Sequence, residues 1–351
     1  MLRKLAIAAL TTSVVFPPTV FAAIAVSTLS CVMPNPANDA VVVDNAGNVY
    51  VSSMGTMINS SQWTGAGVLR IDSDCNVSVF AAITGPIGNA IDGGGNLYVS
   101  SAQFANDRRI YKVLPDGTIT DFVQPTLQGT GGGLVLDSNQ NLYVASYEGD
   151  TISKFDSFGN LIDKFFASGG SLNGPAGLAI DNNDNLYASN FDDGVITKIA
   201  SDGSMSVLTA IGASLGYIAY VNDNLYATGF SSQLIYRITL SGDVSVIAGS
   251  SAGTVDSNDP CTAKFNNPNG IYGNPSGDKI YISQWSNGPV RVLDLSGDDG
   301  STCGGSSGTP PANSPPSGGD SGGSSSGGSV TLPSIIFLFV YFIVSGRRKR
   351  L

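Results

Sequence analysis

The sequence contains no histidine, and Glu148 is its only glutamate. Without imidazole there is no Ser-His-Asp or Cys-His relay, no histidine-ligated zinc and no ordinary general base for neutral pH. Catalysis by Asp, Tyr or Lys stays open. The composition therefore favours a binding protein over an enzyme.

Positive charge is scarce in the body of the chain. Six of the 17 Lys and Arg residues lie at the two ends: Arg3, Lys4, Arg347, Arg348, Lys349 and Arg350. The remaining 11 face 27 Asp and Glu, which leaves the body at a net charge of −16. Because phosphate binding needs clustered cations, nucleic acid is excluded as a partner. Such an excess of acidic residues is typical of domains that their net charge keeps soluble.

One feature recurs six times: a turn rich in Asp, Asn and Gly opens into a short strand with a tyrosine at a fixed place. The anchor tyrosines are Tyr50, Tyr98, Tyr143, Tyr187, Tyr226 and Tyr281. A period of this size with strand-type composition indicates an array of small sheets. Each unit contains four strand-like pieces, and turns such as Asp116-Gly117 and Asp202-Gly203 are typical of hairpins. The pattern predicts an all-β, six-bladed β-propeller of four-stranded antiparallel blades over residues 23–303.

The repeats resemble the NHL-repeat family of six-bladed propellers, which is related to the senescence-marker and gluconolactonase propellers. The resemblance covers residues 33–295 and is strongest over residues 174–190 and 248–271. Glycines recur at the head of the inner strand, where strands converge on the axis: Gly88, Gly133, Gly177, Gly216 and Gly270. The sixth unit lacks an outer strand, and we expect the segment 24–32 to supply it and so close the ring.

Both ends of the chain resemble segments that target a protein for export. Residues 1–22 have the basic start, apolar core and small-residue cleavage site of a signal peptide. Residues 304–331 are Gly-, Ser- and Pro-rich, as in a flexible tether, and residues 332–351 combine an apolar stretch with a basic tail. A 15-residue helix spans only about 22 Å, short of the roughly 30 Å hydrocarbon core.

The tether, short hydrophobic helix and basic cluster resemble the GlyGly-CTERM sorting signal of Gram-negative bacteria. The resemblance implies export across the inner membrane and a sorting protease of the rhomboid type as a partner. It also implies that the protein is membrane-anchored, displayed on the cell surface or secreted. An ordinary single-pass anchor, retained in the membrane, is the alternative.

The four cysteines suit an exported protein, and sequence alone allows three pairings. Cys31 and Cys261 both fall in segments that enter an inner strand, which places them on one face. Cys75 falls in an outer hairpin turn and Cys303 follows a third strand, which places both on the other face. We therefore predict the disulfides Cys31–Cys261 and Cys75–Cys303, with Cys31–Cys303 as the main rival.

Propellers usually bind partners through the loops of one face, including those that follow the second strand. Four residues after the anchor tyrosine stand Tyr147, Phe191, Phe230 and Trp285, with Phe104 and Trp63 nearby in blades two and one. Acidic side chains lie beside them: Asp107, Glu148, Asp150, Asp192 and Asp193. The pattern predicts an aromatic rim that stacks on sugars or grips a protein, with packing between blades as the alternative.

Three function classes follow from these features. We expect an exported, non-enzymatic propeller, monomeric and without a cofactor, that binds a protein, peptide or glycan through loops on one face. The alternative is a metal-dependent lactonase like the gluconolactonase relatives, although Glu148 does not fall where that resemblance requires a glutamate. A structural spacer is the third class. The Asp…Asn pairs of the turns, such as Asp181 and Asn185, could hold Ca²⁺, but side chains that cap a turn explain them more simply.

Overall fold

The computed structural model describes residues 24–31, 33, 38–59, 62–64, 67–101, 109–123, 131–285 and 288–304, without the side chains of 56–59 and 62–64. The predicted signal peptide (1–22), nearly all of the tether (304–331) and the C-terminal hydrophobic helix (332–351) lie outside this range. None of the residues described forms a helix with the length and apolarity needed to cross a membrane.

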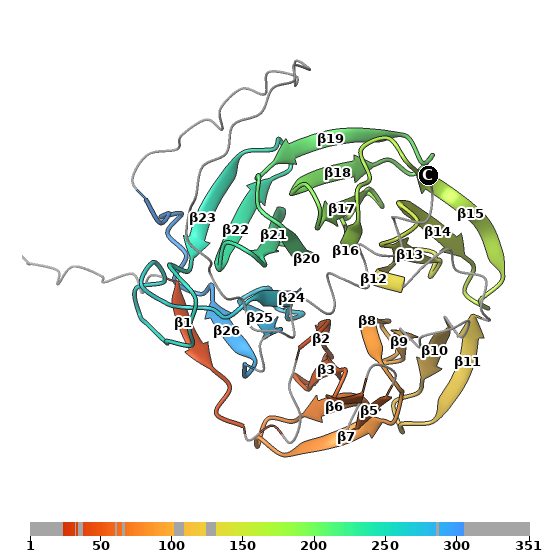
Figure 1. Cartoon of the computed structure of the whole chain (residues 1–351), viewed down its shortest axis with the longest axis horizontal. Coiled ribbons are helices and arrows are strands. Elements are labelled where there is room, and N and C mark those ends of the chain that lie inside the picture. Colours follow the sequence, from red (N-terminus) through yellow and green to blue (C-terminus); the bar gives the residue numbers. More distant parts are fainter. Residues whose placement is uncertain are drawn as a thin grey trace, which may run out of the picture.

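The chain forms six four-stranded antiparallel blades around a central axis, as predicted (Figure 1). Blades one and two comprise β2 (Val41–Val43), β3 (Val49–Ser53), β6 (Gly67–Ile71) and β7 (Val77–Ala81), then β8 (Pro86–Ile91), β9 (Leu97–Ser101), β10 (Ile110–Val113) and β11 (Ile119–Val123). Blades three and four comprise β12 (Gly131–Leu136), β13 (Leu142–Ser146), β14 (Thr151–Phe155) and β15 (Leu161–Ser168), then β16 (Pro175–Ile180), β17 (Leu186–Asn190), β18 (Val195–Ile199) and β19 (Met205–Ala210). Blade five comprises β20 (Leu215–Val221), β21 (Asn224–Gly229), β22 (Leu234–Thr239) and β23 (Val244–Ala248).

Blade six contains strands from both ends of the described chain. It comprises β24 (Pro268–Gly273), β25 (Lys279–Gln284), β26 (Arg291–Asp294) and, as its outer strand, β1 (Ala25–Thr28). β1 runs antiparallel to β26, from Ala25 opposite Asp294 to Thr28 opposite Arg291. The prediction that the N-terminal strand closes the ring is confirmed. A small extra hairpin, β4 (Thr56–Asn59) and β5 (Gln62–Thr64), extends from blade one.

The turn between the first and second strands of a blade is closed by its own aspartate. The Asp92 carboxylate accepts hydrogen bonds from the backbone N–H of Gly94 and Asn96, from Asn96 Nδ2 and, at 3.2 Å, from the hydroxyl of Tyr98. The same set recurs at Asp44, Asp137 and Asp181. These carboxylates cap turns, as the simpler interpretation of the Asp…Asn pairs predicted.

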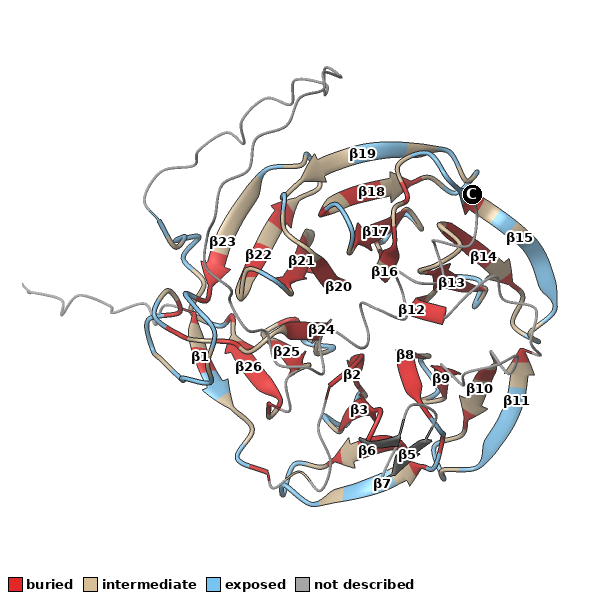
Figure 2. Ribbon diagram, in the orientation of Figure 1, coloured by how far each residue is buried: buried red, intermediate tan, exposed pale blue. Residues whose placement is uncertain are grey.

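Hydrophobic packing lies between neighbouring blades. The second strands β3, β9, β13 and β17 are buried at every position, whereas the outer strand β15 is mostly exposed (Figure 2). Most seams are also joined by a hydroxyl that stands two residues after the anchor tyrosine and donates to a carbonyl at the head of the next blade's inner strand. These bonds run from Ser100 to Gly131, from Ser189 to Gly216, from Thr228 to Asn269 and from Ser283 to Asp39.

The disulfides join Cys31 to Cys75 and Cys261 to Cys303, so the predicted pairs Cys31–Cys261 and Cys75–Cys303 are wrong. The rival Cys31–Cys303 is wrong as well. The prediction assigned each cysteine to one face, but the outer strands run around the circumference of the ring (Figure 1). The end of one outer strand therefore reaches the hairpin turn of the next blade, which is how Cys31, just after β1, meets Cys75 in the β6–β7 turn.

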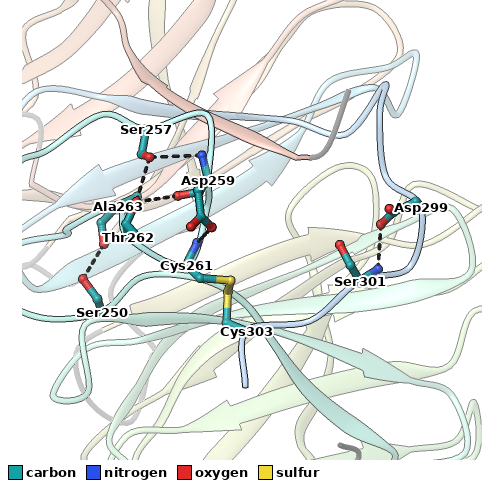
Figure 3. Close-up of a disulfide and its surroundings, with 9 residues drawn as sticks. All are labelled: Ser250, Ser257, Asp259, Cys261, Thr262, Ala263, Asp299, Ser301 and Cys303. Carbon is teal, nitrogen blue, oxygen red and sulfur yellow. Dashed lines mark hydrogen bonds between the residues drawn. A yellow bond between two sulfur atoms is a disulfide. The ribbon is translucent and has the colours of Figure 1, made fainter. Parts of the chain in front are cut away.

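The second disulfide joins two segments that pack around blades five and six. Cys261 belongs to the insertion 249–267 that follows β23, and its backbone N–H is held by the Asp259 carboxylate (Figure 3). Beyond β26 the chain turns back along blade five, where Asp298 forms an ion pair with Arg237 at 2.8 Å. The backbone N–H of Cys303 then donates to the carbonyl of Val246 in β23. This route carries Cys303 to Cys261 and away from Cys75.

Candidate functional site

Four of the predicted rim aromatics form one continuous arc across blades three to six. The ring centroids of Tyr147 and Phe191 lie 6.1 Å apart, those of Phe191 and Phe230 5.2 Å, and those of Phe230 and Trp285 6.5 Å. Neighbouring ring planes are inclined at 58° to 68°. The first two pairs meet edge to face, an arrangement that stabilises aromatic pairs, and the rings of Phe230 and Trp285 are tilted.

The same strand and turn position three of the four rings, and Trp285 directly follows the equivalent strand β25. Tyr147, Phe191 and Phe230 come directly after β13, β17 and β21, and each opens a four-residue turn. The turns end on Asp150, Gly194 and Gln233, all with positive φ. Because the turn is repeated in adjacent blades, residues 39 to 44 apart in sequence fall side by side.

All four rings are half-buried. They pack against one another at the strand ends, as the packing alternative required, and they also retain exposed surface, as the rim interpretation required. The corresponding side chain of blade one, Met54, is fully buried. The arc is thus restricted, among the residues described, to blades three to six.

Acidic side chains beside the arc hold the loops that carry it. The Tyr147 hydroxyl donates to Asp192, which links blade three to blade four. Asp150 accepts the backbone N–H of Gly174 at 2.7 Å, and Asp193 accepts Asn173 Nδ2 at 3.0 Å. Asp150, Asp192 and Asp193 thus lie in the loops that carry the arc, and Glu148 is half-buried on the same turn as Asp150.

Part of the predicted rim is not tested. The backbone of Trp63 lies in β5, but the side chain is outside the described part of the chain, as are Phe104 and Asp107.

Amide groups beneath the arc were not predicted. Asn267 donates from its side chain to the carbonyl of Phe230 at 3.1 Å, and its own carbonyl accepts the N–H of Trp285 at 2.9 Å. The Gln233 side chain accepts the N–H of Asn267 at 2.6 Å. Asn267 is the last residue of the insertion that leads into blade six. The length of this insertion was the only sequence signal that Asn267 supports the arc.

The axis of the ring is obstructed on the rim side. Tyr217 stands at a position of the inner strand that is alanine or glycine in the other five blades. The residues at this position are Ala40, Gly88, Gly133, Gly177 and Gly270. Its side chain extends from blade five to blade one, where the hydroxyl donates to Asp39 at 3.1 Å. Asn269 of blade six also approaches this carboxyl, at 3.4 Å. Asp39, Tyr217 and Asn269 are all buried.

We call Tyr217 and its hydrogen bond to Asp39 the axial plug. Next to this plug lies a central cavity of about 230 Å³, lined by the inner strands of all six blades. Its walls are mainly aliphatic, with Asn89 among them. Burial raises the pKa of Asp39 well above its ordinary value, against the hydrogen bonds from Tyr217 and Asn269. Within the described ranges no three His, Cys, Asp or Glu side chains gather into a group that could hold a metal ion.

Comparison of the sequence with known protein families finds no match. Comparison with curated proteins finds none either. Solved structures do match the fold. Virginiamycin B lyase from Staphylococcus aureus aligns with a TM-score of 0.57 and 16% identity, over 78% of this chain and 99% of the lyase.

Two further structures illustrate the range of similar proteins. An auxiliary nutrient binding protein from Bacteroides ovatus aligns with a TM-score of 0.61 and 15% identity, over 78% of this chain and 76% of that protein. A gluconolactonase from Xanthomonas campestris aligns with a TM-score of 0.56 and 13% identity, over 74% of this chain and 86% of that protein. At such identities the similarity shows the fold alone: this chain is a six-bladed propeller of the kind found in lyases, lactonases and binding proteins.

Proposed function

We propose that this protein is an exported, non-enzymatic propeller that binds a protein, peptide or glycan through the aromatic arc of blades three to six. The observation that carries the proposal is the unbroken contact of four half-buried rings on one face. Large, rigid aromatic side chains supply contact area at low cost in conformational entropy, which is why they dominate recognition surfaces.

The surroundings of the arc support a surface-binding role. The turns that carry it are fixed by hydrogen bonds such as Tyr147 to Asp192 and Asp193 to Asn173, so little ordering is needed on binding. The Tyr217 plug obstructs the axis on the same face, which favours recognition across the rim over entry into the channel.

Export and anchoring form the second part of the proposal. Two disulfides join all four cysteines, as in proteins of an oxidising compartment. We propose that the C-terminal signal, residues 332–351, holds the protein in a membrane of a Gram-negative bacterium until a sorting protease displays or releases it. Comparing the C-terminal mass of the mature protein with the full-length value tests processing against a retained anchor.

Trp285 provides a direct test of the arc. In a Trp63→Phe background it is the only tryptophan, so its fluorescence reports contact at the rim. We would titrate panels of peptides and oligosaccharides, and expect a saturable change that Phe191→Ala weakens by about tenfold or more, the loss typical of a hot spot. Phe158→Ala, which removes an exposed ring far from the arc, is the matched control and should leave affinity unchanged.

Equal affinities for Phe191→Ala and for the control would contradict the proposal. The lactonase alternative is supported only by the fold, as in the gluconolactonase comparison. Metal analysis and lactone hydrolysis on the same preparation address it. One tightly bound divalent ion per chain together with turnover would replace the binding proposal.

A further inference from the structure

A second apolar surface lies on blade three, away from the arc. Four large hydrophobic side chains are strongly exposed there: Phe158 (83%), Leu161 (46%), Ile162 (53%) and Phe165 (50%). We call this group the blade-three patch. Elsewhere in the described residues such side chains occur singly, as Val79, Ile119, Val207 and Val255. Exposed apolar clusters on a soluble domain often mark a contact surface.

The repeats show that this patch is specific to blade three. Phe158 stands in the hairpin turn between the third and fourth strands, just before Gly159. The same position in the other hairpins is Asp74, Asp116, Asp202 or Ser241. β15 is also the longest outer strand, and its pairing with β14 shifts so that Ile162 is an extra residue. Neither feature is required by the blade, because the other blades form without it.

Charged groups beside the patch are already hydrogen-bonded. Asp156 accepts the N–H of Phe158 at 2.9 Å and Asp163 accepts the N–H of Phe165 at 2.9 Å. The Lys164 ammonium lies 5.8 Å from the centroid of the Phe165 ring. Aromatic and aliphatic residues with a lysine at their margin are typical of surfaces that enter the headgroup region of a bilayer.

We propose that the blade-three patch is a membrane contact, which enters the surface of the bilayer that holds the C-terminal segment. This inference rests on the anchoring proposed above. The described chain ends at Gly304, and the 27 residues 305–331 separate it from the apolar segment that begins at Leu332. Fully extended, they could span roughly 90 Å. The linker is therefore long enough for the blade-three patch to reach the same membrane.

Docking in this way would leave the arc accessible. The β14–β15 turn that carries Phe158 lies at the opposite end of β14 from the β13–β14 turn that opens with Tyr147. A bilayer in contact with the first turn would face the side of the ring opposite to the rim. The patch would thus orient the propeller with its arc away from the membrane, toward a partner.

The test uses the full chain reconstituted into phosphatidylcholine vesicles that contain lipids brominated in the acyl chains. Phe158→Trp adds a reporter at the tip of the patch. Val255→Trp adds one at an exposed site of the insertion 249–267, which pairs with β1. β1 and β15 lie on opposite sides of the ring (Figure 1). The Phe158→Trp variant has additional fluorescence from its new side chain. We expect brominated lipids to lower this additional fluorescence by roughly twofold, as for a ring at the headgroup boundary. The fluorescence that Val255→Trp adds should stay unchanged.

The outcomes separate the two proposals. If the chain does not float with the vesicles, anchoring itself fails, and this inference fails with it. If the chain floats but the Phe158→Trp reporter is not quenched, or the Val255→Trp reporter is quenched equally, the membrane contact is overturned while anchoring stands. Self-association that Phe158→Asp abolishes, in place of quenching, would show that the patch binds a second copy and would also overturn the proposal.

Discussion

The four seams that join blades one to five and the one seam that closes the ring are built differently. Along the chain, the hairpin turn of a blade carries a glycine that lies against the preceding outer strand. A Cβ on Gly159 would stand 2.1 Å from the carbonyl oxygen of Phe122, and one on Gly203 2.3 Å from that of Phe166. At the closing seam the turn residue is Cys75, with the same positive φ, and it bonds covalently to Cys31 after β1.

The difference shows what closure requires. Each of the four seams joins blades that are already tethered by a short connection, so close packing and a hydrogen bond suffice. The closing seam brings together residues more than 250 positions apart. It has the N-terminal strand β1 as its outer strand, a covalent link and, at the axis, the bond from Tyr217 to Asp39 that links blade five to blade one.

The largest effect should come from removing the N-terminal strand β1. Deleting Ala23–Val32 takes away β1 with buried Ile24 and Val26, and leaves the edge of β26 unpaired. The loss should exceed the about 5–15 kcal/mol that holds a typical domain folded, so no soluble folded protein is expected. Soluble yield and circular dichroism measure this, with a ten-residue deletion inside 305–331 as the control. A stable truncated protein would show that the ring closes without β1.

The second prediction separates the covalent link from the turn it occupies. Replacing Cys31 and Cys75 by Ser should lower the free energy of unfolding by about 4 kcal/mol, the loop entropy for a separation of 44 residues. The variant Cys31→Ser with Cys75→Gly places at position 75 the glycine that the other hairpin turns have. It should recover about 1 kcal/mol of the lost stability, because glycine tolerates positive φ. Urea unfolding compares the two variants. Equal stabilities would mean that the turn has no preference for glycine.

The fold could be predicted because most blades repeat the same local features. The Asp-capped turn, the anchor tyrosine and the glycine at the strand head each have a local cause, so one alignment of repeats predicts six blades. The disulfide pairing depends instead on the path of the outer strands around the ring. The repeats did contain a signal: Cys75 aligns with Gly117, Gly159, Gly203 and Gly242, which all contact the preceding blade.

The candidate site divides in the same way. The arc could be predicted because Tyr147, Phe191, Phe230 and Trp285 share one position of the repeat. The axial plug was not predicted, because the turn between β20 and β21 is one residue shorter than the Asp-capped turns. The residue opposite the anchor tyrosine lies seven positions before it in blade five (Ala219) and eight in blade four (Ala179), which moves Tyr217 to the place that a simple alignment gives to Gly216. The sequence signal was the absence, in the fifth repeat, of the turn aspartate that the first four repeats share, with Tyr220 in its place.

The third prediction concerns this plug. Burial raises the pKa of Asp39 above its ordinary value of 3.8, so the folded state binds this proton more tightly than the unfolded state. The contribution of Asp39 to stability should therefore be most favourable at low pH and fall as pH rises from 3.8 to the raised value, by about 1.4 kcal/mol per pH unit. Asp39→Asn should remove this slope and be more stable than the wild type at neutral pH.

Tyr217→Phe completes this experiment. It removes the hydroxyl that donates to Asp39 and should cost about 1–3 kcal/mol, the penalty for a buried acceptor that loses its donor. Urea unfolding from pH 4 to 8 measures both variants. If Asp39→Asn leaves the pH dependence of unfolding unchanged, the pKa of the Asp39 carboxyl is the same in the folded and unfolded states.

The smallest effect is expected at the seam between blades three and four. Ala145 stands where other blades have the seam hydroxyl, and the seam relies on bonds at its two ends, Tyr147 to Asp192 and Ser138 to Asp184. Ala145→Ser should add a hydroxyl directed at the carbonyl of Ala176 and stabilise the protein by about 0.5–1 kcal/mol. Ser189→Ala removes the equivalent bond at the next seam and should cost a similar amount. If Ala145→Ser is destabilising, space at this seam is tighter than at the others, and the hydroxyl is absent because it does not fit.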